Sequence, residues 1–248
     1  MPKPVAANPK HTQIRKVLAK ARPSLVRGVG AAARAQGNPA AAEAEWLKLE
    51  AELTQTLKGT LAGSSLPVVS EAEALPENGW VYLALTGRRN AKHGNAACGP
   101  AIAVMHEGRM AACGVLLAQE EDLVLAGAGE GISGSQGRGR VTGRELADAM
   151  IMLPMSSIDT AKLGLMEKAD AVPFHTRKSG NMLADAMMVA IGRADGMIAT
   201  RFNALEQHCA ELMIKEAGGT ARVLQTPAGA VFVGGNVKVA RDLAALFV

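Results

Sequence analysis

The 248-residue sequence has few aromatic side chains, few cysteines and no long apolar run. Aromatic residues make up only 3% of the chain, so its 12 methionines and many alanines must fill much of the core. Three cysteines without C-x-x-C spacing indicate reduced thiols, and we expect a cytoplasmic protein. Because no run of 18 apolar residues and no signal-peptide pattern occur, we expect no membrane-spanning helix.

Acidic residues are absent from residues 1–42, which contain eight lysines and arginines. The rest of the chain has 19 basic and 23 acidic residues. We assign residues 1–40 to a basic N-terminal arm with two short helices, which are interrupted at Pro23. Such an arm can bind an acidic partner, nucleic acid or an anionic surface, and it also fits a transit peptide or a merely solvated helix.

Carboxylates are also absent from residues 80–90, where a buried strand leads into a glycine turn. The strand is indicated by six uncharged residues at 80–85, and Gly87 follows as the turn. Metal-dependent phosphatases place carboxylates for divalent cations at a strand end of this kind, because such cations prefer oxygen ligands. The polar residues here are instead Thr86, Arg88 and Arg89.

Four segments of the chain carry the motifs of a known family. Residues 179–196 join a helix to a Gly-Arg-Ala-Asp turn, and residues 210–219 end in Glu-Ala-Gly-Gly. Residues 231–236 combine a strand with a Gly-Asn turn before a last helix, and residues 99–115 form a hairpin around Glu-Gly-Arg. Together they resemble the inositol monophosphatase family over residues 40–248, most specifically in the C-terminal third.

The family resemblance implies an α/β fold in which helices and sheets stack as a five-layer α-β-α-β-α sandwich. Residues 41–248 would form this domain, with an N-terminal half at 41–150 and a C-terminal half at 151–248. The ligand pocket would lie between the two halves. The resemblance also implies a homodimer.

The family's strand ends in Asp-Pro-Ile-Asp-Gly-Thr, and this chain departs from that motif at most positions. The first aspartate falls on Leu83 and the proline on Ala84. The second aspartate falls on Thr86, and Arg88 takes the place of the threonine, whereas Gly87 keeps the glycine. The resemblance therefore implies a degenerate site, in which Leu83 and Thr86 occupy former metal-binding positions.

The family's two remaining metal-binding positions keep a carboxylate. Glu71 occupies the place of a metal-binding glutamate, although Ala72 replaces the second acid that follows it in the family. In the family a Trp-Asp pair opens the late helix, and Leu205-Glu206 occupies that pair here. Glu71 and Glu206 are thus the candidate metal ligands that the resemblance leaves.

Two carboxylates hold Mg²⁺ weakly, and a phosphatase of this type uses its metal ions as Lewis acids. We therefore expect a pseudoenzyme that needs no cofactor and serves a binding or regulatory role. The alternative is an active phosphatase on an inositol phosphate, a sugar phosphate or a 3′-phosphonucleotide. In that case Mg²⁺ would be held by Glu71 and Glu206, with help from backbone carbonyls.

The altered site has two arginines where the family has metal ions. A glycine turn before a helix favours anions, and arginine adds a bidentate donor for phosphate. We therefore expect a phosphorylated small molecule to bind at Gly87, Arg88, Arg89 and Glu206. The alternative is that both arginines are solvated or paired with nearby acids. A third hypothesis is an interaction protein that contacts nucleic acid or the transcription machinery, as some family members do.

Three further local patterns give structural expectations. Thr142-Gly-Arg-Glu145 fits a capping box for a helix that ends at Leu153. A second helix is expected at residues 158–168. Residues 129–134 match G-x-G-x-x-G, but no helix opens within the motif, so it predicts a hairpin loop rather than a nucleotide site.

Overall fold

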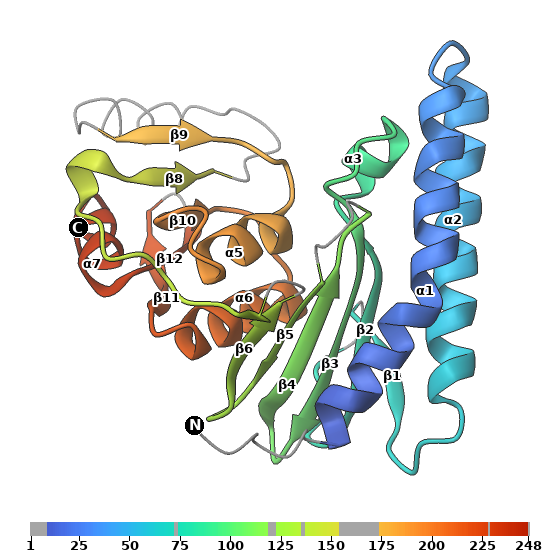
Figure 1. The fold of residues 1–248 in the computed structure, drawn as a ribbon, viewed down its shortest axis with the longest axis horizontal. Coiled ribbons are helices and arrows are strands. Elements are labelled where there is room, and N and C mark those ends of the chain that lie inside the picture. The colour runs from blue at the N-terminus through green and yellow to red at the C-terminus, as the bar shows by residue number, and fades with distance from the viewer. Residues whose placement is uncertain are drawn as a thin grey trace.

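A computed structural model describes the chain as a stack of five alternating helical and sheet layers (Figure 1). Two N-terminal helices cover the first sheet, two helices lie between the sheets, and one helix covers the second sheet. The predicted five-layer sandwich is therefore confirmed. The described residues are 9–71, 74–118, 123–134, 137–153, 174–227 and 229–247.

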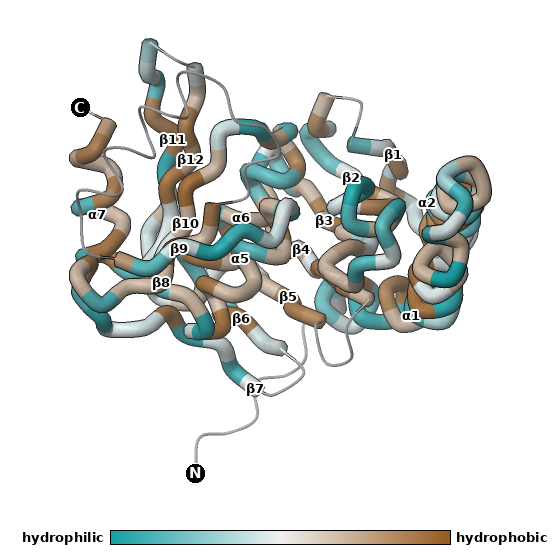
Figure 2. The backbone as a smooth tube through the Cα atoms, turned by 90° about the horizontal axis from the view of Figure 1, so that it is seen from above, coloured by the Kyte–Doolittle hydropathy of each residue, from teal (hydrophilic) through white to brown (hydrophobic). Residues whose placement is uncertain are grey.

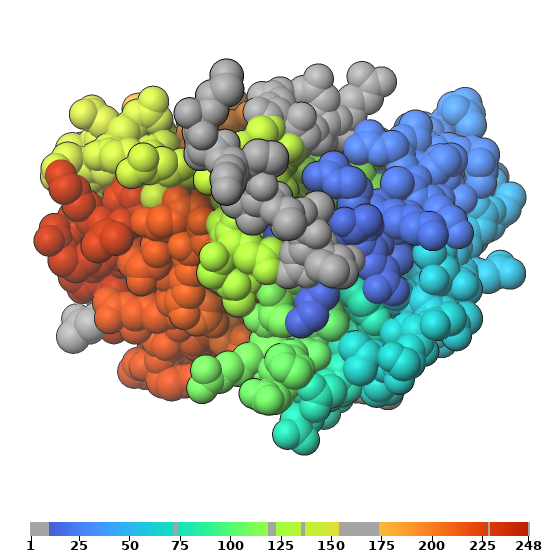
Figure 3. Space-filling model, turned by 60° about the horizontal axis from the view of Figure 1, so that its bottom comes forward, coloured from blue at the N-terminus to red at the C-terminus, as the bar shows by residue number. Residues whose placement is uncertain are grey.

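The first layer is a pair of long helices, α1 (Pro9–Arg34) and α2 (Pro39–Leu61). Asn38 caps α2, because its side chain accepts a hydrogen bond from the Ala41 amide. Both helices bury one apolar face against the first sheet. In the space-filling view, α1, in blue, lies packed against α2, in lighter blue and cyan (Figure 3).

The predicted break at Pro23 is wrong, because α1 continues through the proline. Pro23 lies on the exposed side of the helix, whereas Leu18, Ala21 and Leu25 are fully buried on the side that faces the sheet. Burial of this continuous apolar stripe outweighs the local cost of a proline inside a helix. Figure 1 shows that the helix bends along its length, as a proline in a helix causes.

The first sheet has seven strands in sequential order, β1 to β7. Among the described strands of this sheet, β1 and β2 pair in parallel and all the other neighbours pair antiparallel. Side chains of β2 alternate between two cores: Trp80 and Tyr82 face α1 and α2, whereas Val81 and Leu83 face the central helices. The strands are β1 (Val68–Ser70), β2 (Gly79–Thr86), β3 (Gly99–His106), β4 (Arg109–Leu116), β5 (Leu123–Gly127), β6 (Gly131–Gly134) and β7 (Gly137–Arg138).

The central layer consists of α5 (Met182–Ala190) and α6 (Ala204–Glu216). The second sheet has the order β11-β12-β10-β8-β9, and α7 (Val237–Ala245) packs on its outer face. Figure 2 shows hydrophobic segments along the inner strands β3, β5 and β12. The strands of this sheet are β8 (Met150–Met152), β9 (His175–Arg177), β10 (Gly196–Ala199), β11 (Thr220–Thr226) and β12 (Gly229–Gly235).

The helix predicted from the Thr142–Glu145 capping box to Leu153 is wrong, because this segment forms a short 3₁₀ turn at Leu146–Asp148 and then strand β8. The Thr142 hydroxyl donates to the buried Asp195 carboxylate instead of capping a helix. The other Asp195 oxygen accepts from the Met150 amide at 2.7 Å, which holds the start of β8 in the sheet. A tertiary partner therefore overrides the local capping pattern.

The hairpin predicted at the G-x-G-x-x-G match is confirmed, because β5 and β6 pair antiparallel across it. The amides of Gly129 and Gly131 donate to the two carboxylate oxygens of Glu216, both at 2.8 Å, so these N–H groups already hold an anion of the protein itself. The helix expected at 158–168 lies outside the described residues. Within the described ranges, no helix is both long and apolar enough to cross a membrane.

Candidate functional site

The candidate site lies where β2 ends and the short helix α3 (Arg88–Lys92) begins. Gly87 makes this turn with φ +70°, a left-handed conformation that favours glycine. A Cβ at this position would come within 2.7 Å of the Ala97 carbonyl oxygen and 2.8 Å of the Asn181 Nδ2 atom. The turn therefore requires glycine for both its backbone conformation and its close packing.

Arg88 joins three elements at this turn through ion pairs with two glutamates. Its Nε and Nη2 atoms lie 2.7 and 2.6 Å from Oε1 of Glu50 on α2, and Nη2 lies 3.3 Å from Oε1 of Glu71. Burial lowers the pKa of Arg88, but the ion pairs with Glu50 and Glu71 outweigh it and raise the pKa overall. The guanidinium is therefore a permanent cation beside the retained carboxylate.

Thr86 is buried and directs its hydroxyl into the protein. Its Oγ1 lies 2.8 Å from Oδ1 of Asn181 and 3.3 Å from Oε1 of Glu206, so its single proton is shared between these acceptors. Asn181 caps α5, because its Oδ1 also accepts from the Leu183 amide at 3.0 Å. The threonine hydroxyl thus takes part in a closed network that joins β2 to both central helices.

Glu206 belongs to a capping box at the start of α6. Its Oε2 accepts from the Asn203 amide at 3.1 Å, while the Asn203 side chain accepts from the Glu206 amide at 2.8 Å. Burial raises the pKa of Glu206, and the nearby Glu71 adds to this effect, whereas Asn203, Thr86 and Arg88 lower it. Both carboxylate oxygens therefore already have partners within the protein.

The remaining predicted site residues contribute no oxygen ligand. Leu83 is 3% exposed and packs in the core between the first sheet and the central helices. Arg89 lies exposed on α3, next to Arg88. Lys92 at the end of α3 pairs with Glu43, so α2 supplies an acid to each of two cations on α3.

The donor set does not fit Mg²⁺, which prefers six oxygen ligands in a near-octahedral arrangement. Glu71 and Glu206 lie close enough to affect one another electrostatically, but Arg88 pairs with Glu71 at 3.3 Å and its charge also lowers the pKa of Glu206. Across the residues that the structure describes, no three His, Cys, Asp or Glu side chains are placed to hold a metal ion together. The structure thus brings together Glu71, Thr86, Gly87, Arg88 and Glu206.

Sequence reasoning missed Glu50, Asn90 and Asn181. Glu50 gives no local signal, because it lies on α2, 38 positions before its partner Arg88. Asn90 donates from Nδ2 to the carbonyls of Ala97 and Ser179, both at 2.9 Å, and so fixes α3 to the segment before α5. Asn181 could have been found, because an asparagine just before an apolar helical pattern indicates a cap.

The five layers and the position of this site define a protein with the inositol monophosphatase fold. The native crystal structure of the extragenic suppressor protein suhB from Bartonella henselae has a TM-score of 0.82 with this chain at 20% identity, covering 97% of this chain and 98% of that one. An inositol monophosphatase from Zymomonas mobilis has a TM-score of 0.77 at 13% identity, with 98% and 99% covered. These likenesses confirm the resemblance at the level of the fold.

Mycobacterium tuberculosis SuhB is also similar, with a TM-score of 0.70, 24% identity and coverage of 94% and 96%. Among curated proteins, a putative Nus factor SuhB from Neisseria meningitidis serogroup B is 26% identical over 155 residues. That alignment spans 60% of this chain and 59% of the relative. No family model matches the chain.

Proposed function

We propose that this protein uses the inositol monophosphatase fold for binding and not for Mg²⁺-dependent hydrolysis of phosphate esters. The observation that carries the proposal is Arg88, whose guanidinium lies between Glu50 and Glu71 beside the end of β2. A metal ion at this place would meet a permanent positive charge within a few ångströms. Like charges at such distances repel strongly in a partly buried environment.

The same geometry bears on the ligand. The Nε and Nη2 donors of Arg88 already bond to Glu50 and Glu71, so the guanidinium has few donors left for a phosphate group. This arrangement favours the alternative in which Arg88 pairs with nearby acids over binding of a phosphorylated small molecule by Gly87, Arg88, Arg89 and Glu206. A binding role would therefore use another surface of the molecule.

A phosphate-release assay tests the loss of hydrolysis. The full chain is incubated with inositol phosphate, sugar phosphates and 3′-phosphoadenosine at millimolar Mg²⁺ or Mn²⁺, and we expect no turnover. Glu71→Gln is the diagnostic variant, and Glu107→Gln on the exposed β3–β4 turn is its matched control. Sustained turnover that Glu71→Gln abolishes and Glu107→Gln leaves intact would establish the active phosphatase instead.

A second candidate function is nucleic-acid binding by the solvent face of α1. Arg15, Lys16 and Lys20 are exposed there. Lys16 and Lys20 line a groove of about 400 Å³ with Thr12, Gln13, Val17 and Thr60, and none of the described residues that line it is acidic. One curated relative is described as a putative Nus factor, which supports an association with transcription as a proposal for this chain.

Binding of this kind would depend on phosphate contacts, because the described residues of the groove include no aromatic side chain for base stacking. The test titrates a fluorescent single-stranded RNA with the full chain at two salt concentrations. We expect affinity to fall with salt and to weaken in Lys16→Ala/Lys20→Ala, while Lys215→Ala on α6 binds as the unmodified chain does. Equal affinity of all three proteins would contradict the candidate.

We also propose a homodimer, as the family resemblance implies. Light scattering during size-exclusion chromatography measures the mass directly, and a monomeric mass across the accessible concentration range would contradict this proposal.

A further inference from the structure

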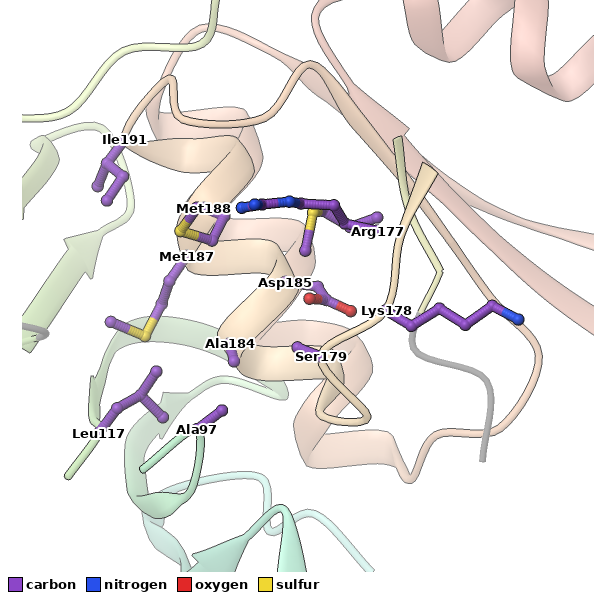
Figure 4. A pocket seen from close by; sticks show the side chains of 11 residues that line it. Ala97, Leu117, Arg177, Lys178, Ser179, Ala184, Asp185, Met187, Met188 and Ile191 are labelled. Carbon is purple, nitrogen blue, oxygen red and sulfur yellow. The ribbon is translucent and has the colours of Figure 1, made fainter. Parts of the chain in front are cut away.

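A cavity of about 320 Å³ opens beside α5, between the two sheets and apart from the site at β2 (Figure 4). Ala97 and Leu117 line it from the first sheet's side, and Met152 and Arg177 line it from β8 and β9. The α5 residues Ala184, Asp185, Met187, Met188 and the following Ile191 form its wall, and Lys178 and Ser179 complete the lining.

The wall on α5 is a single apolar stripe. Ala184, Met187, Met188 and Ile191 follow the i, i+3, i+4, i+7 spacing that places side chains on one helix face. Seven residues of helix span about 10 Å, so the stripe is elongated. The stripe therefore suits a narrow apolar chain better than a compact polar molecule.

Asp185 provides the polar feature of this cavity. Its side chain is 0% exposed, and neither carboxylate oxygen has a hydrogen-bond partner in the described part of the chain. The Ser179 hydroxyl donates to the Asn181 carbonyl at 3.0 Å; it also acts on Asp185 enough to lower the carboxyl pKa, but not in the geometry of a hydrogen bond. Arg177 and Lys178 are exposed, and Figure 4 shows the Lys178 ammonium pointing away from the carboxylate. A buried acid without a partner is costly, so a ligand that supplies a hydrogen-bond donor would stabilise it.

Burial raises the pKa of Asp185 to about 7, and the Ser179 hydroxyl lowers it by less. The carboxyl group therefore changes its charge in the neutral range. A bound cation would shift this balance toward the ionised form, because an opposite charge nearby favours the charged acid.

We propose that this cavity binds a small, elongated primary amine. The ammonium group donates to Asp185, and the alkyl chain lies on the stripe from Ala184 to Ile191. Arg177 and Lys178 also line the cavity, but both side chains are exposed to solvent, whereas Asp185 is the buried charged group that an occupant would meet. A purely apolar molecule would leave its carboxylate unpaired. A single carboxylate also provides too few oxygen ligands for a metal ion. The inference stands independently of the function proposed for the β2 site.

Calorimetric titration of the full chain with hexylamine at pH 8 tests the proposal, with 1-hexanol and hexanoate as probes of the same length. We expect hexylamine to bind more tightly than either. A charge-assisted hydrogen bond is lost in Asp185→Asn, so affinity for hexylamine should weaken by about 10- to 100-fold. Asp148→Asn makes the same chemical change at an exposed position and should leave the affinity unchanged.

Met188→Trp narrows the stripe without touching the carboxylate, and it should weaken hexylamine binding as well. Circular dichroism of each variant checks that it is folded before titration. The proposal is overturned if hexylamine and 1-hexanol bind alike, if Asp185→Asn binds hexylamine as tightly as the unmodified chain, or if the folded, unmodified chain shows no binding at millimolar hexylamine.

Discussion

The site at the end of β2 and the cavity beside α5 both contain buried or half-buried carboxylates, but they differ in how those carboxylates are satisfied. At β2, Glu71 pairs with Arg88, and Glu206 accepts from Asn203 and Thr86. In the cavity, Asp185 has no such partner in the described residues. Carboxylates whose oxygens already accept hydrogen bonds within the chain stabilise the fold and have few free acceptor positions for a ligand. A carboxylate without partners keeps its acceptor positions free.

The largest test of this contrast is the pH dependence of stability. Burial raises the pKa of Asp185 from 3.8 to about 7, so between these values the folded chain holds a proton that the unfolded chain has released. The raised pKa therefore adds to the free energy of unfolding. This added stability is fully present below pH 3.8 and is lost as the pH rises through 7. Urea titrations should show a loss of roughly 2 to 3 kcal/mol between pH 5 and pH 8.

Asp185→Asn should remove most of that pH dependence, and Asp148→Asn should retain it. The residual slope has the same sign, because burial also raises the pKa of Glu206. An unchanged slope in Asp185→Asn would mean that the carboxyl group has found a partner, and the contrast between the two regions would then disappear.

The next effect concerns the turn that closes the β2 site. Gly87→Ala places a methyl group against the Ala97 carbonyl and the Asn181 amide in a left-handed conformation. Strain of this kind costs about 1 to 3 kcal/mol, and a shift of Asn181 would also disturb the cap of α5. Thermal unfolding measures the loss. Gly108→Ala is the control, since it has a similar φ of +70° but nothing within 4 Å of a new Cβ. Equal losses in the two variants would show that the packing around Gly87 contributes nothing.

The smallest effect is expected from Arg88→Ala. The Arg88 side chain is 53% exposed, so removing its ion pairs should cost only about 0.5 to 1 kcal/mol. Removing the guanidinium should also weaken the opposition to cations at Glu71, and Mn²⁺ should then bind more tightly than in the unmodified chain. Calorimetry with Mn²⁺ measures this change, and Arg27→Ala, which breaks an exposed pair with Glu52, is the control. No gain in Mn²⁺ affinity would argue against the role assigned to Arg88.

The sequence predicted the elements that depend on local pattern. The buried β2 strand, the Gly87 turn and the five layers follow from apolar runs, turn residues and family resemblance, and the structure contains all of them. The helix expected to follow the Thr142–Glu145 capping box does not form, because Thr142 and Met150 both donate to oxygens of Asp195, far along the chain. Local rules cannot include a partner that only the folded chain brings near.

The sequence identified most residues of the candidate site but not the ion pairs between them. Glu71, Thr86, Arg88 and Glu206 were identified from their positions in the family motif, whereas Glu50 lies in a helix that carries no such motif. The sequence also did not predict that the Asp185 carboxylate lacks hydrogen-bond partners, because this depends on how the interior packs. Which charges are neutralised is decided by tertiary contacts, and charge compensation in turn decides which surface can accept a ligand.

Arg88 has one more consequence for the molecule. Its guanidinium connects helix α2, through Glu50, to Glu71 just after β1, and so fastens the outer helical layer to the edge of the first sheet. A counter-ion that is part of the chain cannot be washed out, exchanged for another ion or withdrawn by a chelator. The charge balance around Glu50 and Glu71 is therefore set by the amino-acid sequence and is independent of the ions in the surrounding solution.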